Sequence, residues 1–219
     1  EFSSPFTRVT PFFKIKLDNG GNANVSFKLF QIYILRSPLL SKEQAVDWQI
    51  NQVDGHIIYQ HPELSTRVTV DWFNPDFWLD NEAVIGQSKG RHITYFVKHQ
   101  QDKMVLRHYF RGGLVSKLLT DQFLYTGINN TRAIAELNML NKMFQLGLPV
   151  PKPVAAMVSK TAGLWCKNDI LIELINAKDG FHSLLKKAWP EDVWVKLGLT
   201  IKQFHQAGVY HSDLNIHNI

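Results

Sequence analysis

Two residues near the end of the sequence, Asp213 and Asn218, place a carboxylate and an amide five positions apart. His211 precedes them, so the stretch reads His-x-Asp-Leu-x-x-x-Asn. A carboxylate can take the proton of an attacking hydroxyl group, and an amide oxygen can bind a magnesium ion that nucleotide phosphates also hold. A short loop that directs both groups to one place predicts transfer of a phosphoryl group to an alcohol.

This order and spacing is the catalytic-loop pattern of protein kinases. It predicts Asp213 as the catalytic base and Asn218 as a magnesium ligand. An amphipathic helical pattern precedes the loop, which is the context that the pattern requires. We interpret His211 as a structural brace. A metal role for His211 together with His205 and His217 has no ligand-type spacing in its favour.

A second candidate element is the stretch Gly86-Gln-Ser-Lys89-Gly90, which lies between two β-rich runs. Glycine permits close approach of the backbone, so the N–H groups of such a loop can cover phosphates, and Lys89 can add positive charge. The alternative is a plain hairpin turn, because the stretch has fewer glycines than the full glycine-rich pattern.

A third element pairs a cation with a carboxylate. Arg107 ends the run Met-Val-Leu-Arg, where protein kinases carry a lysine that binds the α- and β-phosphates. Arginine can bind phosphate with two hydrogen bonds and keeps its charge. Glu136 lies in a strong helical pattern, where the kinase arrangement places a carboxylate against that cation. An exposed strand cation and an exposed helical carboxylate are the alternatives; we favour an ion pair.

A fourth element is the apolar run Ile170–Ile175, which is typical of a buried strand and is followed by polar residues. In the kinase arrangement such a strand leads into a hinge whose backbone contacts adenine. The hypothesis names the Glu173 carbonyl and the Ile175 N–H as these contacts, and it depends wholly on that arrangement.

The elements that must position these residues follow the order strands, helix, strands, helix, which predicts a segregated α+β fold. Asn74 and Pro75 open a predicted helical turn, Asn130 and Thr131 cap a predicted helix, and Gly147 ends it. The expected strands are 27–35, 53–60, 83–86, 92–99, 104–110, 154–158, 164–167 and 170–175, and the expected helices are 75–79, 130–146 and 190–208.

The composition is that of a globular protein, with 45% hydrophobic and 20% charged residues in 219. The net charge of +5 fits either a solvated basic face or an anionic partner. The single cysteine, Cys166, excludes an intramolecular disulfide and a multi-cysteine zinc site. No apolar run approaches the roughly 20 residues that span a bilayer, and no signal peptide is recognisable.

Three segments together resemble the Kdo kinase family, the 3-deoxy-D-manno-octulosonic acid kinases of Gram-negative lipopolysaccharide synthesis. These segments are Leu106–Leu114, Gly147–Pro153 and His211–Asn218. The resemblance implies a protein-kinase-like fold, with ATP and Mg²⁺ serving transfer to the 4-hydroxyl of Kdo on a lipid A precursor. It also implies a peripheral place on the cytoplasmic face of the inner membrane; neither a nucleic acid nor a protein partner is expected.

The resemblance begins near residue 46 and implies three parts. Residues 1–45 form an unmatched N-terminal extension, 46–175 an antiparallel-sheet N-terminal lobe, and 176–219 the start of a helical C-terminal lobe, which is truncated. The main magnesium carboxylate is expected beyond Ile219, so we expect this chain alone to be inactive and prone to aggregate. A heptose-type sugar kinase and a catalytically silent kinase-like module that binds nucleotide or lipid are the alternatives.

Overall fold

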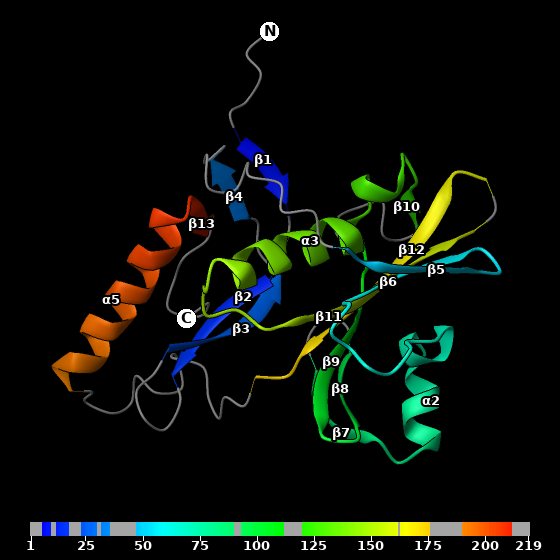
Figure 1. The fold of residues 1–219 in the computed structure, drawn as a ribbon, viewed down its shortest axis with the longest axis horizontal. Coiled ribbons are helices and arrows are strands. Elements are labelled where there is room, and N and C mark those ends of the chain that lie inside the picture. The colour runs from blue at the N-terminus through cyan, green and yellow to red at the C-terminus, as the bar shows by residue number, and fades with distance from the viewer. Residues whose placement is uncertain are drawn as a thin grey trace, which may run out of the picture. The chain divides into compact units, whose positions relative to one another are not determined.

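The computed structural model resolves into two compact units, one formed by residues 46–138 and 152–174 and the other by 1–45, 139–151 and 175–219 (Figure 1). Of the described residues before position 36, and of Lys89 and His211, only the backbone is described. The residues that the structure describes are 6–9, 12–17, 23–29, 32–35, 47–89, 93–111, 120–161, 163–175 and 190–211.

The unit of residues 46–138 and 152–174 is built around an antiparallel sheet of eight strands, in the order β5-β6-β11-β12-β9-β8-β7 with β10 paired to β12. The chain therefore has a mixed α/β fold, and the predicted antiparallel sheet is confirmed. The kinase lobe arrangement stays a prediction. The strands are β5 (Gln49–Val53), β6 (His56–Gln60), β7 (Val84–Lys89), β8 (Ile93–His99), β9 (Asp102–His108), β10 (Phe123–Leu124), β11 (Pro153–Lys160) and β12 (Trp165–Glu173).

At two places in this sheet the chain is divided into strands differently from the prediction. The expected extended run 53–60 is a hairpin, because Asp54 and Gly55 adopt φ values of 46° and 81° and turn the chain between β5 and β6. Such left-handed residues form the tight turns that twisted hairpins require. The expected strands 164–167 and 170–175 are one strand, β12, because the polar residues between them pair with β11 and β9.

One face of the sheet is covered by η1 (Val70–Phe73) and α2 (Pro75–Asp80). The helical turn predicted from Asn74 is confirmed, since the Asn74 side chain accepts a hydrogen bond from the N–H of Asp76 at 3.0 Å. The buried indole of Trp78 donates to the carbonyl of Trp72 at 2.7 Å. These aromatic residues belong to one apolar core with Val97, Met104, Leu106, Ala155 and Leu171 of the sheet.

The predicted helix after Thr131 is confirmed as α3 (Arg132–Gln145). Gly147 follows it with a φ of 68°, the left-handed conformation with which many helices end. Glu136 of α3 contacts Arg107 of β9. Because successive strand residues face opposite sides, Arg107 and the core residue Leu106 lie on different faces. The part of α3 that carries Glu136 therefore lies on the face opposite α2.

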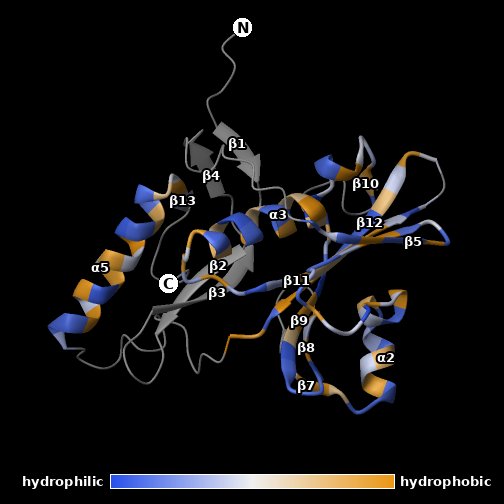
Figure 2. Ribbon diagram, viewed as in Figure 1, coloured by the Kyte–Doolittle hydropathy of each residue, from blue (hydrophilic) through white to orange (hydrophobic). Residues whose placement is uncertain are grey.

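In the other unit, the expected single strand 27–35 is two strands, β3 (Ala23–Leu29) and β4 (Ile32–Leu35), since β3 pairs with β2 (Phe12–Leu17) and β4 with β1 (Phe6–Val9). The last predicted helix is confirmed as α5 (Glu191–Gln206), with Pro190 at the N-cap rather than the first helical position. Bands of hydrophobic and hydrophilic residues follow one another along α5 (Figure 2). Strand β13 (Val209–His211) follows and pairs with β4.

Candidate active site

The structure brings two of the predicted residues together. Arg107 lies on β9, and its Nη2 donates to Oε1 of Glu136 on α3. Both residues are buried, with 9% and 1% of their surface exposed. The predicted ion pair is therefore present, and neither residue is the exposed surface charge that the alternative required. Its role in nucleotide binding stays a prediction.

A third residue, Tyr109, joins the pair and was not predicted. Its hydroxyl donates to Oε2 of Glu136 and accepts a hydrogen bond from Nη2 of Arg107 at 3.3 Å. The guanidinium carbon also lies 5.1 Å from the centre of the Tyr109 ring. The signal in the sequence is the spacing of two, which places residues 107 and 109 on the same side of an extended chain.

Burial and charge keep Tyr109 and Arg107 protonated. Burial, followed by the charge of Glu136, raises the pKa of Tyr109 well above its ordinary value, so the phenol keeps its proton. Burial by itself lowers the pKa of Arg107, but Glu136 and Tyr109 outweigh that effect, and the net pKa is raised. The phenol therefore keeps its proton and the guanidinium its charge, and both donate to the side chain of Glu136.

Side chains from the sheet region hold helix α3 beside this cluster. The Asn168 side chain of β12 accepts a hydrogen bond from the N–H of Ala133 at 3.2 Å, in the first turn of the helix. The indole of Trp48 donates to the Asn138 side chain at 2.8 Å. Thr131 lies before the helix as predicted, but its hydroxyl donates to the carbonyl of Ile128 at 2.6 Å.

The predicted phosphate loop is shorter than expected. Strand β7 continues through Gly86 to Lys89, because residues 87–89 pair with β8. Gly86 therefore lies in a strand, next to an irregularity in its register. A Cβ atom there would approach Cδ2 of Phe96 to 3.0 Å, so the Phe96 ring would have to shift by a few tenths of an ångström to admit a side chain. Gly90 and the side chain of Lys89 lie outside the described residues, and a role in phosphate binding stays a prediction.

The predicted adenine contacts lie at the end of β12. The backbone N–H of Glu173 donates to the carbonyl of Lys152 at 2.9 Å, and its carboxylate accepts from the Lys152 N–H at 2.9 Å. Leu174 donates to the carbonyl of Lys103 at 2.8 Å. These bonds attach the end of β12 to neighbouring segments. Ile175 is half-buried, and its contact with adenine, like that of Glu173, stays a prediction.

The catalytic-loop residues Asp213 and Asn218 lie outside the described residues. The backbone of His211 is described and forms the end of β13, opposite Ile32 of β4. A short strand thus leads directly into the predicted loop. Within the described part of the chain, no group of three or more histidine, cysteine or acidic residues could hold a metal ion. No helix in that part is long and apolar enough to cross a bilayer.

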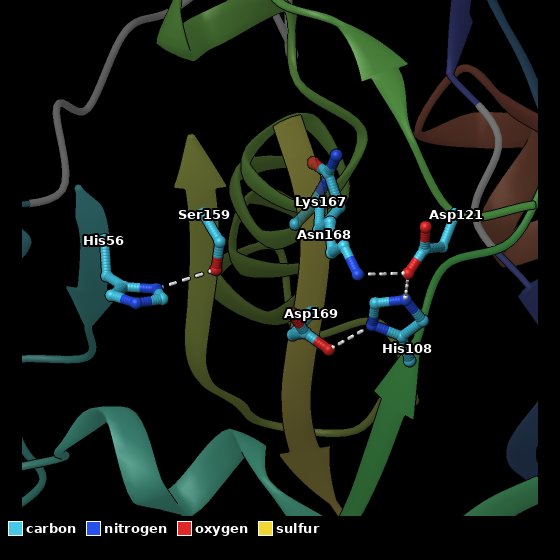
Figure 3. Close-up of polar contacts among 8 residues, drawn as sticks. His56, His108, Asp121, Ser159, Lys167, Asn168 and Asp169 are labelled. Atoms are coloured by element: carbon cyan, nitrogen blue, oxygen red, sulfur yellow. Dashed lines mark hydrogen bonds and ion pairs between the residues drawn. The ribbon is translucent and has the colours of Figure 1, made fainter. Parts of the chain in front are cut away.

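A separate polar network lies on the sheet face opposite Arg107 (Figure 3). The His108 ring contacts Asp169 through Nδ1 at 2.6 Å and Asp121 through Nε2 at 3.2 Å. Lys167 contacts the same oxygen of Asp121 at 2.8 Å. The network ties β9 and β12 to the segment that precedes β10. The network does not contact the cluster of Arg107, Tyr109 and Glu136 (the Arg107 cluster), because residues 107 and 108 face opposite sides of β9.

His108 lies at the centre of this network and can gain or lose a proton. Burial by itself lowers the pKa of His108, but its bonds to Asp169 and Asp121 outweigh that effect and raise the pKa. The pKa of Asp121 is lowered, because Lys167 and His108 together outweigh its burial. Burial raises the pKa of Asp169. When His108 is protonated, its ring can donate through Nδ1 to Asp169 and through Nε2 to Asp121.

This arrangement predicts how stability depends on pH. The pKa of His108 is raised in the folded state. The contribution of His108 to the free energy of unfolding is therefore complete below about pH 6.5, the ordinary histidine value, and is lost as the pH rises through the folded pKa. We expect His108→Gln to weaken the fall of the melting temperature as the pH rises above about 6.5. The matched control is His56→Gln, since His56 bonds Ser159 at 2.8 Å instead of a carboxylate. Parallel pH profiles for His108→Gln and the wild type would contradict this account.

Comparison with known proteins identifies the family to which this chain belongs. A family model described as lipopolysaccharide kinase (Kdo/WaaP) family matches residues 75–219, a range that includes every predicted site residue. The chain belongs to this family. The match covers Arg107, Tyr109 and Glu136 as well as the predicted loop residues Asp213 and Asn218.

Relatives named 3-deoxy-D-manno-octulosonic acid kinase confirm the resemblance predicted from the sequence. The relative of Photobacterium damsela subsp. piscicida is 40% identical over 172 residues, 78% of this chain and 72% of the relative. That of Haemophilus influenzae is 38% identical over 176 residues, 78% of this chain and 73% of the relative. That of Vibrio cholerae is 44% identical over 147 residues, 67% of this chain and 62% of the relative. No solved structure matches the chain.

Proposed function

We propose that this member of the lipopolysaccharide kinase family transfers the γ-phosphoryl group of ATP to the 4-hydroxyl of Kdo on a lipid A precursor. The observation that carries the proposal is the buried bond between Arg107 and Glu136, in a chain whose relatives are named Kdo kinases. A strand cation held by a helix carboxylate is the arrangement with which protein kinases bind nucleotide phosphates.

The residues of the Arg107 cluster fit a phosphate ligand. A guanidinium presents several N–H donors in one plane, so a single group can bind a carboxylate and a phosphate together. When bound, Mg²⁺ would neutralise charge that develops on the β- and γ-phosphates. We assign Asn218 as one of its ligands and expect the main carboxylate ligand in the segment that follows the catalytic loop.

The remaining assignments complete the proposal. Asp213 orients the Kdo hydroxyl and accepts its proton. The backbone at Gly86 and Gly90, with the Lys89 side chain, covers the phosphates. The end of β12 and the residues after it contact adenine through the Glu173 carbonyl and the Ile175 N–H. In this proposal residues 46–175 act as the nucleotide-binding lobe and 176–219 begin the acceptor lobe.

The net charge of +5 supports the proposed partners. ATP, the phosphates of lipid A and the carboxylate of Kdo are all anionic, so a basic protein attracts each of them. A peripheral position on the cytoplasmic face of the inner membrane would bring the enzyme to its lipid-linked acceptor. We propose neither a nucleic acid nor a protein partner.

The test of acceptor identity uses the full-length protein, ATP labelled at the γ-phosphate and a matched set of acceptors. We expect label in the Kdo-bearing lipid A precursor, and none in the precursor without Kdo or in one that carries 4-deoxy-Kdo. Transfer to the 4-deoxy analogue would contradict the assignment of the 4-hydroxyl. Transfer to a heptose-bearing acceptor alone would identify a heptose-type kinase, and ATP binding without transfer to any acceptor would indicate a silent module.

A further inference from the structure

Tyr109 contacts both members of the ion pair. Its hydroxyl donates to one carboxylate oxygen of Glu136, while Nη2 of Arg107 donates to the other oxygen and to the Tyr109 hydroxyl itself. The three groups close a ring of hydrogen bonds between β9 and α3. Tyr109 is 4% exposed, so this ring is shielded from water and its bonds are stronger than they would be at the surface.

The backbone fixes Tyr109 in this position. Tyr109 lies just past the end of β9, and its N–H donates to the carbonyl of Asn168 on β12 at 3.0 Å. The side chain of Asn168 in turn accepts from the N–H of Ala133 at the start of α3. Strand, tyrosine and helix are thus linked through both backbone and side chains, which leaves the phenol little freedom to move away from Glu136.

The guanidinium of Arg107 must be correctly oriented to bind phosphate, and its contacts with Tyr109 restrict its orientation. A lysine ammonium is a compact point charge, whereas a guanidinium is a flat group whose donors bind phosphate well only when its plane is correctly turned. A bond from Nη2 to Glu136 fixes the position of that nitrogen, and rotation of the guanidinium plane about this bond is limited by further contacts. The additional contact with the Tyr109 hydroxyl, and the ring 5.1 Å from the guanidinium carbon, restrict that rotation.

We propose that Tyr109 is a positioning residue, which holds the guanidinium of Arg107 in the orientation that binds the phosphates of ATP. The inference rests on the proposed role of Arg107 in ATP binding. Tyr109 acts through Arg107 and Glu136, so its hydroxyl affects the nucleotide and has no effect on recognition of the acceptor.

The test measures the KM for ATP and the KM for the Kdo-lipid acceptor in the full-length protein. Tyr109→Phe removes only the hydroxyl and should raise the KM for ATP about tenfold, the scale of one hydrogen bond to a charged group. The KM for the acceptor should stay unchanged. Tyr95→Phe is the matched control, because Tyr95 of β8 packs against the core on the opposite face of the sheet. KM does not depend on the amount of active enzyme, so partial unfolding cannot imitate this result.

The double variant Arg107→Ala/Tyr109→Phe separates this inference from the proposed function. If Tyr109 acts through Arg107, the double variant should have the same KM for ATP as Arg107→Ala. Additive effects would show that the hydroxyl acts independently and would overturn the inference. A wild-type KM in Tyr109→Phe beside a raised KM in Arg107→Ala would also overturn it, with the proposed function intact. A wild-type KM in Arg107→Ala would instead contradict the role proposed for Arg107, and the inference with it.

Discussion

Asp213→Asn is expected to lower the turnover of the full-length protein by ~10²–10⁴-fold, the usual contribution of a general base. Asparagine has nearly the same shape as aspartate but cannot accept the proton of the Kdo hydroxyl at neutral pH. ATP should still bind, because the proposed phosphate contacts lie on β7 and β9. The measurement is the rate of phosphoryl transfer at saturating ATP and acceptor, with ATP affinity determined separately by calorimetry.

The control for this variant is Asp192→Asn. Asp192 is exposed on α5, the helix that precedes the predicted catalytic loop, and its contact with Lys196 at 3.4 Å is a surface ion pair. Such pairs contribute little, so this variant should keep wild-type turnover. Wild-type turnover in Asp213→Asn would contradict the assignment of the base. A loss of ATP binding equal to the loss of turnover would show that the residue binds nucleotide instead.

Arg107→Ala is expected to weaken ATP binding about 100-fold, because it removes one partner of a buried charge pair at the proposed phosphate site. Glu136→Ala should weaken binding less, since the cation remains. Calorimetric titration with ATP and Mg²⁺ measures both effects. Arg67→Ala is the control, because Arg67 is an exposed arginine on the segment between β6 and η1.

Arg107→Ala also leaves the carboxylate of Glu136 buried without its cation, which can cost about 3–5 kcal/mol of stability. Arg107→Lys is therefore the second variant, because it keeps the positive charge. We expect it to bind ATP more weakly than the wild type, since one ammonium group cannot reproduce the paired donors of a guanidinium. Unchanged ATP affinity in folded Arg107→Lys and Arg107→Ala would move the phosphate contact to another cation, with Lys98 and Lys103 next to be tested.

The ion pair could be predicted from the sequence because its members occupy well-marked elements. Arg107 lies within a predicted strand, and Glu136 lies in a helix whose end is signalled by Gly147. Local patterns also predicted α2 and α5 correctly. The strand and the helices depend on residues close together in the chain, where spacing and capping are strong signals. The pairing of Arg107 with Glu136, 29 residues away, followed from the kinase arrangement.

The features that were missed depend on partners far apart in the sequence. Asn168 and Asp169 interrupt an apolar run and predicted a break, yet they lie inside β12, where one binds the start of α3 and the other binds His108. Tyr109 was passed over because the kinase arrangement, which indicated the pairing of Arg107 with Glu136, names no third residue that contacts Glu136. The turn at Asp54 and Gly55 is a different case, since its sequence signal was present and was misinterpreted.

The most direct test of the account follows the γ-phosphate of ATP into a Kdo-bearing lipid A precursor. The full-length wild type and Asp213→Asn are compared at equal concentration, and the position of the phosphate in the product is determined by NMR. We predict a product phosphorylated at the 4-hydroxyl of Kdo with the wild type and a rate lower by ~10²–10⁴-fold with the variant. Phosphate at another position, or equal rates for the two proteins, would contradict the account.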